Sequence, residues 1–336
     1  MSTERPTGEV AAALAMLGGA AVLGGVALAL KKAPSAEAPL AARAQWSLPR
    51  PLAKPPAVPP LDRKTTVRAA RRLNRAAGTL ALSVLADSAV EHYRGSFHNK
   101  AMVTPLVTSA LSLMVSAHGH FDNRRGAHIA RDMVYATAGI TGLVGTGFHL
   151  YNVAKKPGGI SWQNLFYQAP LGAPAALTLS GMLGFLSERL RDNPTDEHPT
   201  ILGFPAGRIL GLMTSLGLLG TVAEAGLLHF RGAYHNPAMY LPVTAPPTAA
   251  ALLAASSLAE GGRPRPLTRW WLRFTALLGF LGCGFHAVGV GRNMGGWRNW
   301  RQTLLNGPPL PAPPSFAGLA LAGLAALGLM EDPPDD

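Results

Sequence analysis

The amino-acid sequence predicts an all-α integral membrane protein with about nine transmembrane helices, one at the N-terminus followed by two tandem four-helix repeats in parallel orientation. Three observations lead to this fold class: the spacing of the apolar runs, the abundance of small residues, and an internal repeat. The chain has 336 residues, 38 of them glycine, and a mean hydropathy of +0.17. Proline-rich and arginine-rich connectors lower this average, while glycine and alanine suit helices that pack closely in lipid.

Apolar runs define the predicted helices. Each approaches the ~20 residues that cross a hydrocarbon layer ~30 Å thick. The runs cover residues 8–30, 76–92, 101–118, 132–152, 165–187, 201–229, 237–259, 269–290 and 313–330. Their number and length favour a helical membrane protein over a pair of soluble domains.

The last eight runs form the internal repeat. Residues 87–159 align with 224–296 at a constant offset of 137, and the match resumes at "PLGAP" (170–174) and "PLPAP" (309–313). Each copy contains four spans, and an even number of spans predicts copies that face the same way in the membrane. The expected domains are the N-terminal transmembrane helix (1–30), a Pro-rich and basic cytoplasmic linker (31–75), the first repeat (76–200) and the second repeat (201–336).

The distribution of charge predicts the orientation. If the spans alternate, 21 Lys and Arg lie on the side of the linker and nine on the other side. Basic residues favour the cytoplasm, so we expect a bacterial inner-membrane protein with a cytoplasmic linker. The first run is long for a signal peptide and is followed by Lys31 and Lys32, which predicts a retained helix with its N-terminus outside.

Composition also limits the chemistry. Cys283 is the only cysteine, which excludes internal disulfides and cysteine-based metal sites. We attribute the net charge of +12 to membrane orientation and expect the lipid bilayer, not nucleic acid, as the partner. Residues 62–78, "DRKTTVRAARRLNRAAG", predict a short basic helix lying on anionic headgroups.

One polar phrase occurs twice. "HYRGSFHNKAM" (92–102) and "HFRGAYHNPAM" (229–239) are identical at seven of eleven positions. Gly95 and Gly232 are expected to take the left-handed conformation that ends a helix, and Asn99 and Asn236 to cap the next one. Each phrase therefore predicts a tight corner between two helices.

A second phrase, "GLVGTGFH" (142–149) and "GFLGCGFH" (279–286), places small residues beside a histidine. Glycines spaced three apart, followed by a histidine four residues later, share one helical face. This face is expected to receive either another helix or the edge of a planar cofactor.

With alternating spans, three histidines of each copy reach the same outer end of the protein. Neutral imidazole is the commonest metal ligand, and two imidazoles at one depth suit bis-histidine haem ligation. A carboxylate within a membrane helix is a functional candidate by default. The candidates for binding haem b are His92, His149, His229 and His286 as axial ligands, Arg94 and Arg231 for the propionates, and Gly145 and Gly282 for the macrocycle edge; those for a transition metal are His92, His98, His149, His229, His235, His286, Asp87 and Glu224.

These residues predict a membrane subunit of a redox system with two equivalent outer-face sites, exchanging electrons with a periplasmic redox protein or a quinone. Two alternatives remain open. The first is a transporter or channel built from parallel repeats, with Asp87 and Glu224 in its substrate path. The second is a structural membrane anchor without a cofactor, in which the corner is a folding device. No catalytic triad, phosphate-binding loop or HExxH motif indicates a particular enzymatic reaction.

Overall fold

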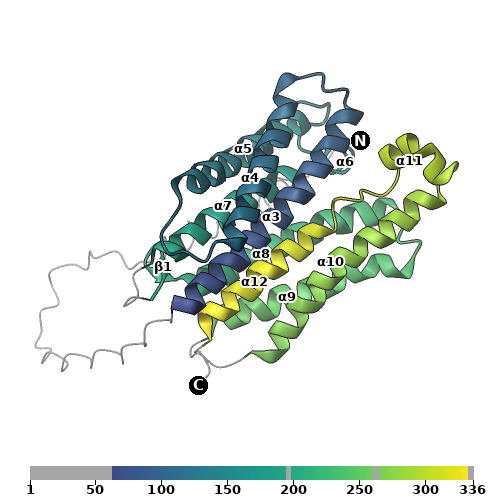
Figure 1. Cartoon of the computed structure of the whole chain (residues 1–336). Coiled ribbons are helices and arrows are strands. Elements are labelled where there is room, and N and C mark those ends of the chain that lie inside the picture. The colour runs from purple at the N-terminus through teal and green to yellow at the C-terminus, as the bar shows by residue number, and fades with distance from the viewer. Residues whose placement is uncertain (1–62, 194–197, 260–264, 332–336) are drawn as a thin grey trace, which may run out of the picture.

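The computed structural model describes residues 63–193, 198–259 and 265–331, which fold into a bundle of long helices (Figure 1). The long helices are α3 (Arg63–Arg94), α4 (Thr104–Phe121), α5 (Ile129–Ala154), α7 (Gly172–Asp192), α8 (Ala206–Arg231), α9 (Leu241–Leu258), α10 (Pro266–Arg292) and α12 (Pro314–Met330). The shorter elements are α6 (Trp162–Tyr167), α11 (Trp300–Asn306), the 3₁₀ helices η1 (Lys100–Val103), η2 (Pro237–Tyr240) and η3 (Gly296–Asn299), and the strands β1 (Thr200–Ile201) and β2 (Phe204–Pro205).

Within the described residues, four helices are long and apolar enough to cross a membrane. They are Lys100–Phe121 (η1 with α4), Ala206–Arg231 (α8), Pro237–Leu258 (η2 with α9) and Pro266–Arg292 (α10); Pro314–Met330 (α12) is apolar but shorter. Large apolar side chains also face outward, including Ile140 at 64% exposure and Phe148 at 59%. A large exposed apolar surface on a helical bundle suits contact with lipid, so the protein is all-α with the character of a membrane protein. The apolar run 8–30 lies outside the described residues.

Helix α3 differs from the sequence-based expectation. The predicted short basic helix at 62–78 is the first part of one continuous helix that runs to Arg94, and the expected linker boundary at residue 75 falls inside it. Leu73, Asn74 and Ala77 are fully buried within the bundle, so the prediction of a separate short helix was wrong. The arginines alternate with small and apolar residues that face α4, α7 and α12, and this buried face holds the segment in the bundle.

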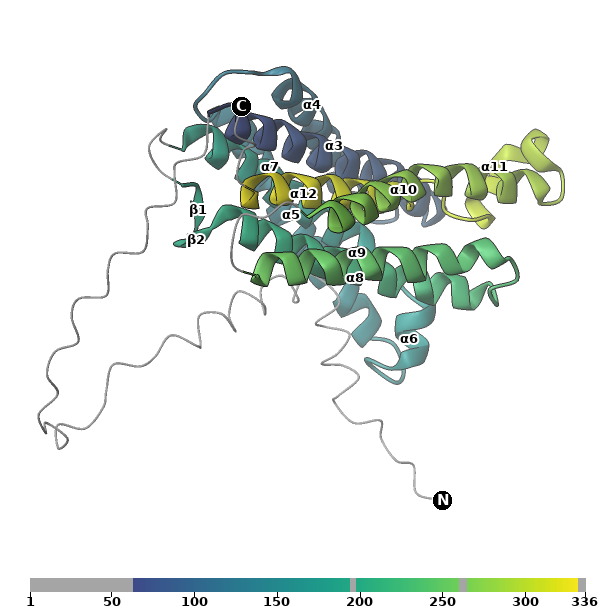
Figure 2. The ribbon, with the colours of Figure 1, turned by 90° about the horizontal axis from the view of Figure 1, so that it is seen from below.

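The helices form two groups of four with the same contacts. In the first group, α3 packs against α4 and α7, and α5 packs against the same two helices. In the second group, α8 packs against α9 and α12, and α10 packs against α9 and α12. Helix α12 also packs along α3, which joins the groups (Figure 2). A small antiparallel hairpin, β1–β2, precedes α8 and turns through Leu202 and Gly203, both with positive φ.

A buried ionic network ties the first group together near the start of α3. Glu188 of α7 bridges two arginines: its Oε2 lies 2.9 Å from Arg131 Nη2 and its Oε1 lies 3.7 Å from Arg191 Nε. All three side chains are at most 1% exposed. Arg131 also pairs with Asp122 at 2.8 Å, and Arg191 donates to Asn74 Oδ1 at 3.1 Å. Two positive and two negative charges therefore balance in the bundle interior.

The same network sets the ionisation of Asp122, in the connector after α4. Burial by itself raises the pKa of this carboxyl, but the backbone N–H of Arg124 and the Arg131 guanidinium outweigh burial and hold the pKa below its ordinary value of 3.8. Its contribution to stability is therefore complete above that value and is lost as the pH falls through the lower pKa of the folded protein.

The second group has apolar or small residues at the equivalent places. By the sequence alignment, Glu188, Arg191, Arg131 and Tyr135 correspond to Leu327, Met330, Thr268 and Leu272. The Tyr135 ring lies against Gly184, and Leu272 lies against Gly323 at the equivalent contact. The same helix arrangement is therefore stabilised by charge pairing in one group and by apolar packing in the other.

We predict that Glu188→Gln destabilises the protein strongly. Removing one partner of a buried ion pair leaves uncompensated charge and typically costs about 3–5 kcal/mol. Asp192→Asn is the matched control, because it makes the same chemical change at an exposed position of the same helix. The check is the midpoint of unfolding in detergent. Equal midpoints for the two variants would show that the network contributes little to stability.

Candidate histidine site

The corner between α3 and α4 has its left-handed residues in an unexpected place. Ser96 and Phe97 have φ of 57° and 45°, and the equivalent Ala233 and Tyr234 have φ of 53° and 46°. Gly232 has φ of −81°, so the prediction of a left-handed glycine was wrong there, and Gly95 is likewise not among the positive-φ glycines.

Gly95 and Gly232 are needed because a larger side chain would not fit at these positions. A Cβ on Gly95 would lie 3.1 Å from Met102 Cε, and one on Gly232 would lie 3.0 Å from Met239 Cε. The methionine that ends each phrase thus packs on the glycine. Two consecutive left-handed residues with side chains cost roughly 1–2 kcal/mol each, so other contacts must hold the corner.

The capping prediction is confirmed. Asn99 Oδ1 accepts a hydrogen bond from Ala101 N, and Asn236 Oδ1 accepts one from Ala238 N, each at 2.9 Å. Pro237 occupies the start of η2, where the absence of an N–H costs nothing.

The first histidine of each phrase stabilises the corner with a hydrogen bond. His92 Nδ1 donates to Met102 O at 2.6 Å, and His229 Nδ1 donates to Met239 O at 2.9 Å. Each bond joins the last turn of one helix to the 3₁₀ turn that begins the next, across the left-handed pair. A proton on Nδ1 leaves Nε2 with a free lone pair.

The histidines of the second phrase make the same kind of bond. His149 Nδ1 donates to Pro170 O, and His286 Nδ1 donates to Pro309 O at 2.7 Å. Pro170 and Pro309 lie just before α7 and α12, so each histidine joins the end of one helix to the approach of the next. All four imidazoles therefore have the same tautomer and a fixed ring orientation.

The two histidines of each group come together. The His229 and His286 rings are 6.4 Å apart between centroids, with an interplanar angle of 72°. His92 lies within electrostatic range of His149. The sequence predicted these pairs, and the structure brings the rings of the second pair close together.

The remaining two histidines belong to the local turn. His98 Nδ1 donates to Gly95 O and His235 Nδ1 to Gly232 O, each at 3.0 Å and exposed. These bonds close the turn itself. Each imidazole therefore bonds to the carbonyl of the residue three positions earlier in the chain.

The glycine faces receive helices. A Cβ on Gly145 would lie 3.2 Å from Pro174 Cβ, and one on Gly282 would lie 2.7 Å from Pro313 Cβ. The preceding glycines, Gly142 and Gly279, are in still closer contact with the backbones of α7 and α12. The sequence left open whether a helix or the edge of a planar cofactor packs on this face, and in both groups it is a helix.

The two candidate arginines reach across to the other group. Arg94 pairs with Glu91 at 3.2 Å and donates to Leu305 O at the end of α11. Arg231 lies over the rings of Phe166 and Tyr167 in α6, 5.6 and 5.2 Å from their centroids. Each short helix therefore contacts the corner of the opposite group, so the two corners lie at the same end of the molecule.

The two candidate carboxylates lie between the groups. Glu224 Oε1 accepts a hydrogen bond from Gly172 N, the first residue of α7, at 3.1 Å. The carboxylate fills the space where a Cβ on Gly172 would stand. Asp87 lies within electrostatic range of Glu224, Glu91 and Arg94. Glu224 thus caps a helix of the first group from a helix of the second, a contact that sequence reasoning missed.

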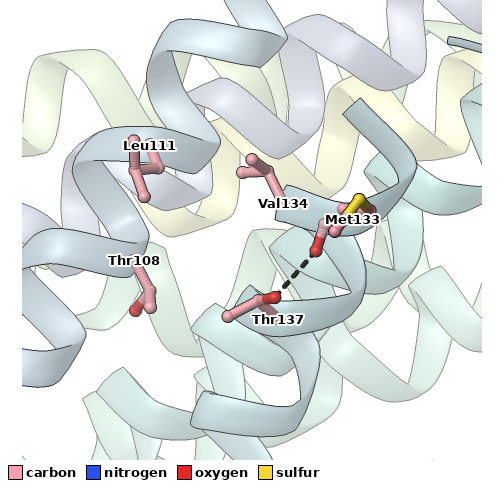
Figure 3. Close-up of a pocket in the computed structure, with 5 residues that line it drawn as sticks. All are labelled: Thr108, Leu111, Met133, Val134 and Thr137. Atoms are coloured by element: carbon pink, nitrogen blue, oxygen red, sulfur yellow. Dashed lines mark hydrogen bonds between the residues drawn. The ribbon is translucent and has the colours of Figure 1, made fainter. Parts of the chain in front are cut away.

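Over the described residues, no group of three or more His, Cys, Asp and Glu side chains is arranged to hold a metal ion. Two shallow surface pockets lie on the outer faces of α4 and α5. One, of about 210 Å³, is lined by Thr108, Leu111, Met133, Val134 and Thr137 (Figure 3); the other, of about 350 Å³, is lined by Val144, Gly147, Phe148 and Tyr151. Neither pocket is lined by a candidate residue.

Comparison of the chain with models of protein families, with curated proteins and with solved structures finds no match.

We predict that Gly172→Ala destabilises the protein by about 1–3 kcal/mol, because a new methyl group would displace the Glu224 carboxylate from the start of α7. The control is Gly147→Ala, where nothing lies within 4 Å of the new Cβ and where alanine favours the helix. Thermal unfolding in detergent measures both. If Gly172→Ala leaves the midpoint unchanged, Glu224 does not hold this helix end.

Proposed function

We propose that the chain is the membrane subunit of a redox system, in which a pair of imidazoles at the outer end of each half binds haem b or a transition metal. In this proposal one N-terminal helix precedes two parallel four-helix repeats, giving nine spans. The two groups of helices have the same internal contacts, and equivalent histidine bonds occur in both. The reciprocal contacts of Arg94 and Arg231 with the short helices support a parallel arrangement.

The geometry of His229 and His286 carries the proposal. A metal–nitrogen bond is about 2 Å long, and each ring nitrogen lies ~1 Å from its ring centre, so two imidazoles on one metal have centres about 6 Å apart. The observed separation is 6.4 Å. Both Nδ1 atoms are bound to backbone carbonyls, which is the outer-shell support that metal-binding histidines commonly have.

The small number of ligands favours haem over a non-haem metal. A non-haem site usually takes three or more protein ligands, and no such group occurs in the described part of the chain. Haem iron needs only two axial ligands from the protein, and would supply one-electron transfer between ferric and ferrous states. Gly145 and Gly282 pack against helices in both halves, so the proposal rests on the imidazole pairs and not on the glycine face.

Both sites lie at one end of the bundle, so they do not form a chain of carriers across the membrane. The proposal therefore places electron exchange at the outer face, with a periplasmic redox protein or a membrane quinone as the partner. The charge distribution supports this side, because the helix ends opposite the histidines carry most of the Lys and Arg.

The test is the absorption spectrum of the purified chain, expressed with haem supply. We expect a Soret band that falls by about half in His286→Ala or His229→Ala, since one of two sites is lost. His149→Ala should remove the other half. His235→Ala is the matched control, because this ring bonds only within its own turn, and its band should equal that of the wild type. A colourless, metal-free preparation would end the proposal.

A transporter is the second candidate, and the position of the carboxylates favours it. Asp87 of the first group and Glu224 of the second lie near each other where the two halves meet. The interface between the halves is the usual place for a substrate site in proteins built from parallel repeats. Two observations weigh against it. Helix α9 is unbroken despite Pro246 and Pro247, and Glu224 lies seven residues from the end of α8, about 10 Å at 1.5 Å per residue, away from its middle.

Uptake into vesicles tests this alternative. If the carboxylates bind a cationic substrate or proton, Asp87→Asn and Glu224→Gln should each abolish uptake, while Glu91→Gln, one turn further out on α3, should retain it. An absence of uptake for all tested cations, together with a haem spectrum, would exclude transport in favour of the redox proposal.

A further inference from the structure

Five arginines gather at the end of the bundle opposite the histidines. Arg68, Arg72 and Arg75 are spaced four and three apart on α3, and Arg269 and Arg273 are spaced four apart on α10, so each set shares one helical face. Arg72 lies within electrostatic range of all four others. Two stripes of positive charge from different halves therefore face the same place.

Helix α12 lies between α3 and α10, the helices that carry the two stripes (Figures 1 and 2). Arg72 Nη1 donates to Leu324 O at 3.4 Å and lies 3.3 Å from the position of a Cβ on Gly328. The missing side chain at Gly328 thus makes room for the guanidinium beside α12. Helix α12 thus forms the base of the cluster, with the arginines of α3 on one side and those of α10 on the other.

Among the described residues, acidic side chains do not neutralise the positive charge of this cluster. Glu331 pairs with Arg269, and this is the one ion pair made there by any of the five arginines. Arg68, Arg75 and Arg273 are exposed, while Arg72 and Arg269 are half-buried. Like charges held this closely repel one another, so a bound anion would stabilise the arrangement.

The equivalent positions of the other half do not carry an arginine cluster. By the alignment, Arg269 corresponds to Asp132 and Gly328 to Arg189, and these two form an ion pair. Arg68, Arg72 and Arg75 correspond to Pro205, Ile209 and Leu212. The cluster is therefore not repeated between the halves, and it lies where α12 packs along α3, whereas α7 makes little contact with α8.

Aromatic residues accompany the cluster on α10. Trp270 is 56% exposed and its ring stacks on Phe274, with centroids 5.5 Å apart. Exposed tryptophan is typical of the interface between hydrocarbon and headgroups. The arginines beside it on the same two turns are therefore expected at the depth of lipid phosphates.

We propose that the five arginines bind the phosphate of an anionic phospholipid headgroup in the cytoplasmic leaflet, at the junction of α3, α12 and α10. Guanidinium groups donate paired hydrogen bonds to phosphate oxygens. A lipid is favoured over a free phosphate because the cluster is flanked by exposed apolar and aromatic side chains that would contact its acyl chains. The site is independent of any cofactor at the histidines.

The test compares lipids in thermal unfolding of the full chain in detergent. We expect phosphatidylglycerol to raise the unfolding temperature more than phosphatidylcholine does, and inorganic phosphate at equal concentration to have no such effect. In the double variant Arg72→Gln, Arg273→Gln, the preference for phosphatidylglycerol over phosphatidylcholine, measured as bound lipid by native mass spectrometry, should fall on the order of tenfold or more.

The control removes two charges elsewhere. Arg124→Gln with Arg298→Gln changes exposed arginines outside the cluster and should keep the lipid preference. An unchanged preference in the cluster variant would overturn the proposal, as would an equal effect of inorganic phosphate. Asp332, Asp335 and Asp336 follow in the sequence; if a preference appears only after these are changed to Asn, they are the natural occupant and the lipid proposal fails.

Discussion

The close approach of α7 to α5, and of α12 to α10, is the contact on which the rest of the structure depends. Gly142 and Gly279 leave no room for a side chain between the two backbones. In lipid, helices gain little from hiding apolar surface, so close packing of small residues must hold them together. The same contact brings Pro170 and Pro309 within hydrogen-bonding distance of His149 and His286. The position of each histidine therefore follows from glycines one and two turns earlier.

The two ends of the bundle have diverged to different extents. At the histidine end the same bonds recur in both halves, down to the capping asparagine and the methionine packed on glycine. At the other end one half has a buried, charge-balanced ionic network, and the other has apolar packing with an arginine cluster beside it. Paired buried charges and an apolar core can both hold helices together, so helix packing alone does not dictate the chemistry of that end.

Much of the helix order and of the local geometry could be predicted from residue types. Asparagine before a helix start is a local signal, and its caps formed as expected. The predicted left-handed glycine failed because the same residue serves two needs: Gly232 makes room for Met239, and the chain turns at Ala233 and Tyr234 instead. Nothing local distinguishes these uses, since the methionine that requires the space comes seven residues later. The basic segment before residue 76 was misassigned for a related reason, because its apolar face is recognised only when α7 and α12 are in place.

The sequence by itself determined that the chain is helical, where four long apolar helices of the described residues lie, and that one polar phrase occurs twice. These are properties of periodicity, length and repetition along the chain. Only the tertiary structure decided that Glu224 caps α7, that helices fill the glycine faces, that Arg94 and Arg231 reach the opposite half, and that arginines of α3 and α10 converge around α12. Each of these joins residues that are distant in sequence, and it is the packing of the helices that sets such contacts.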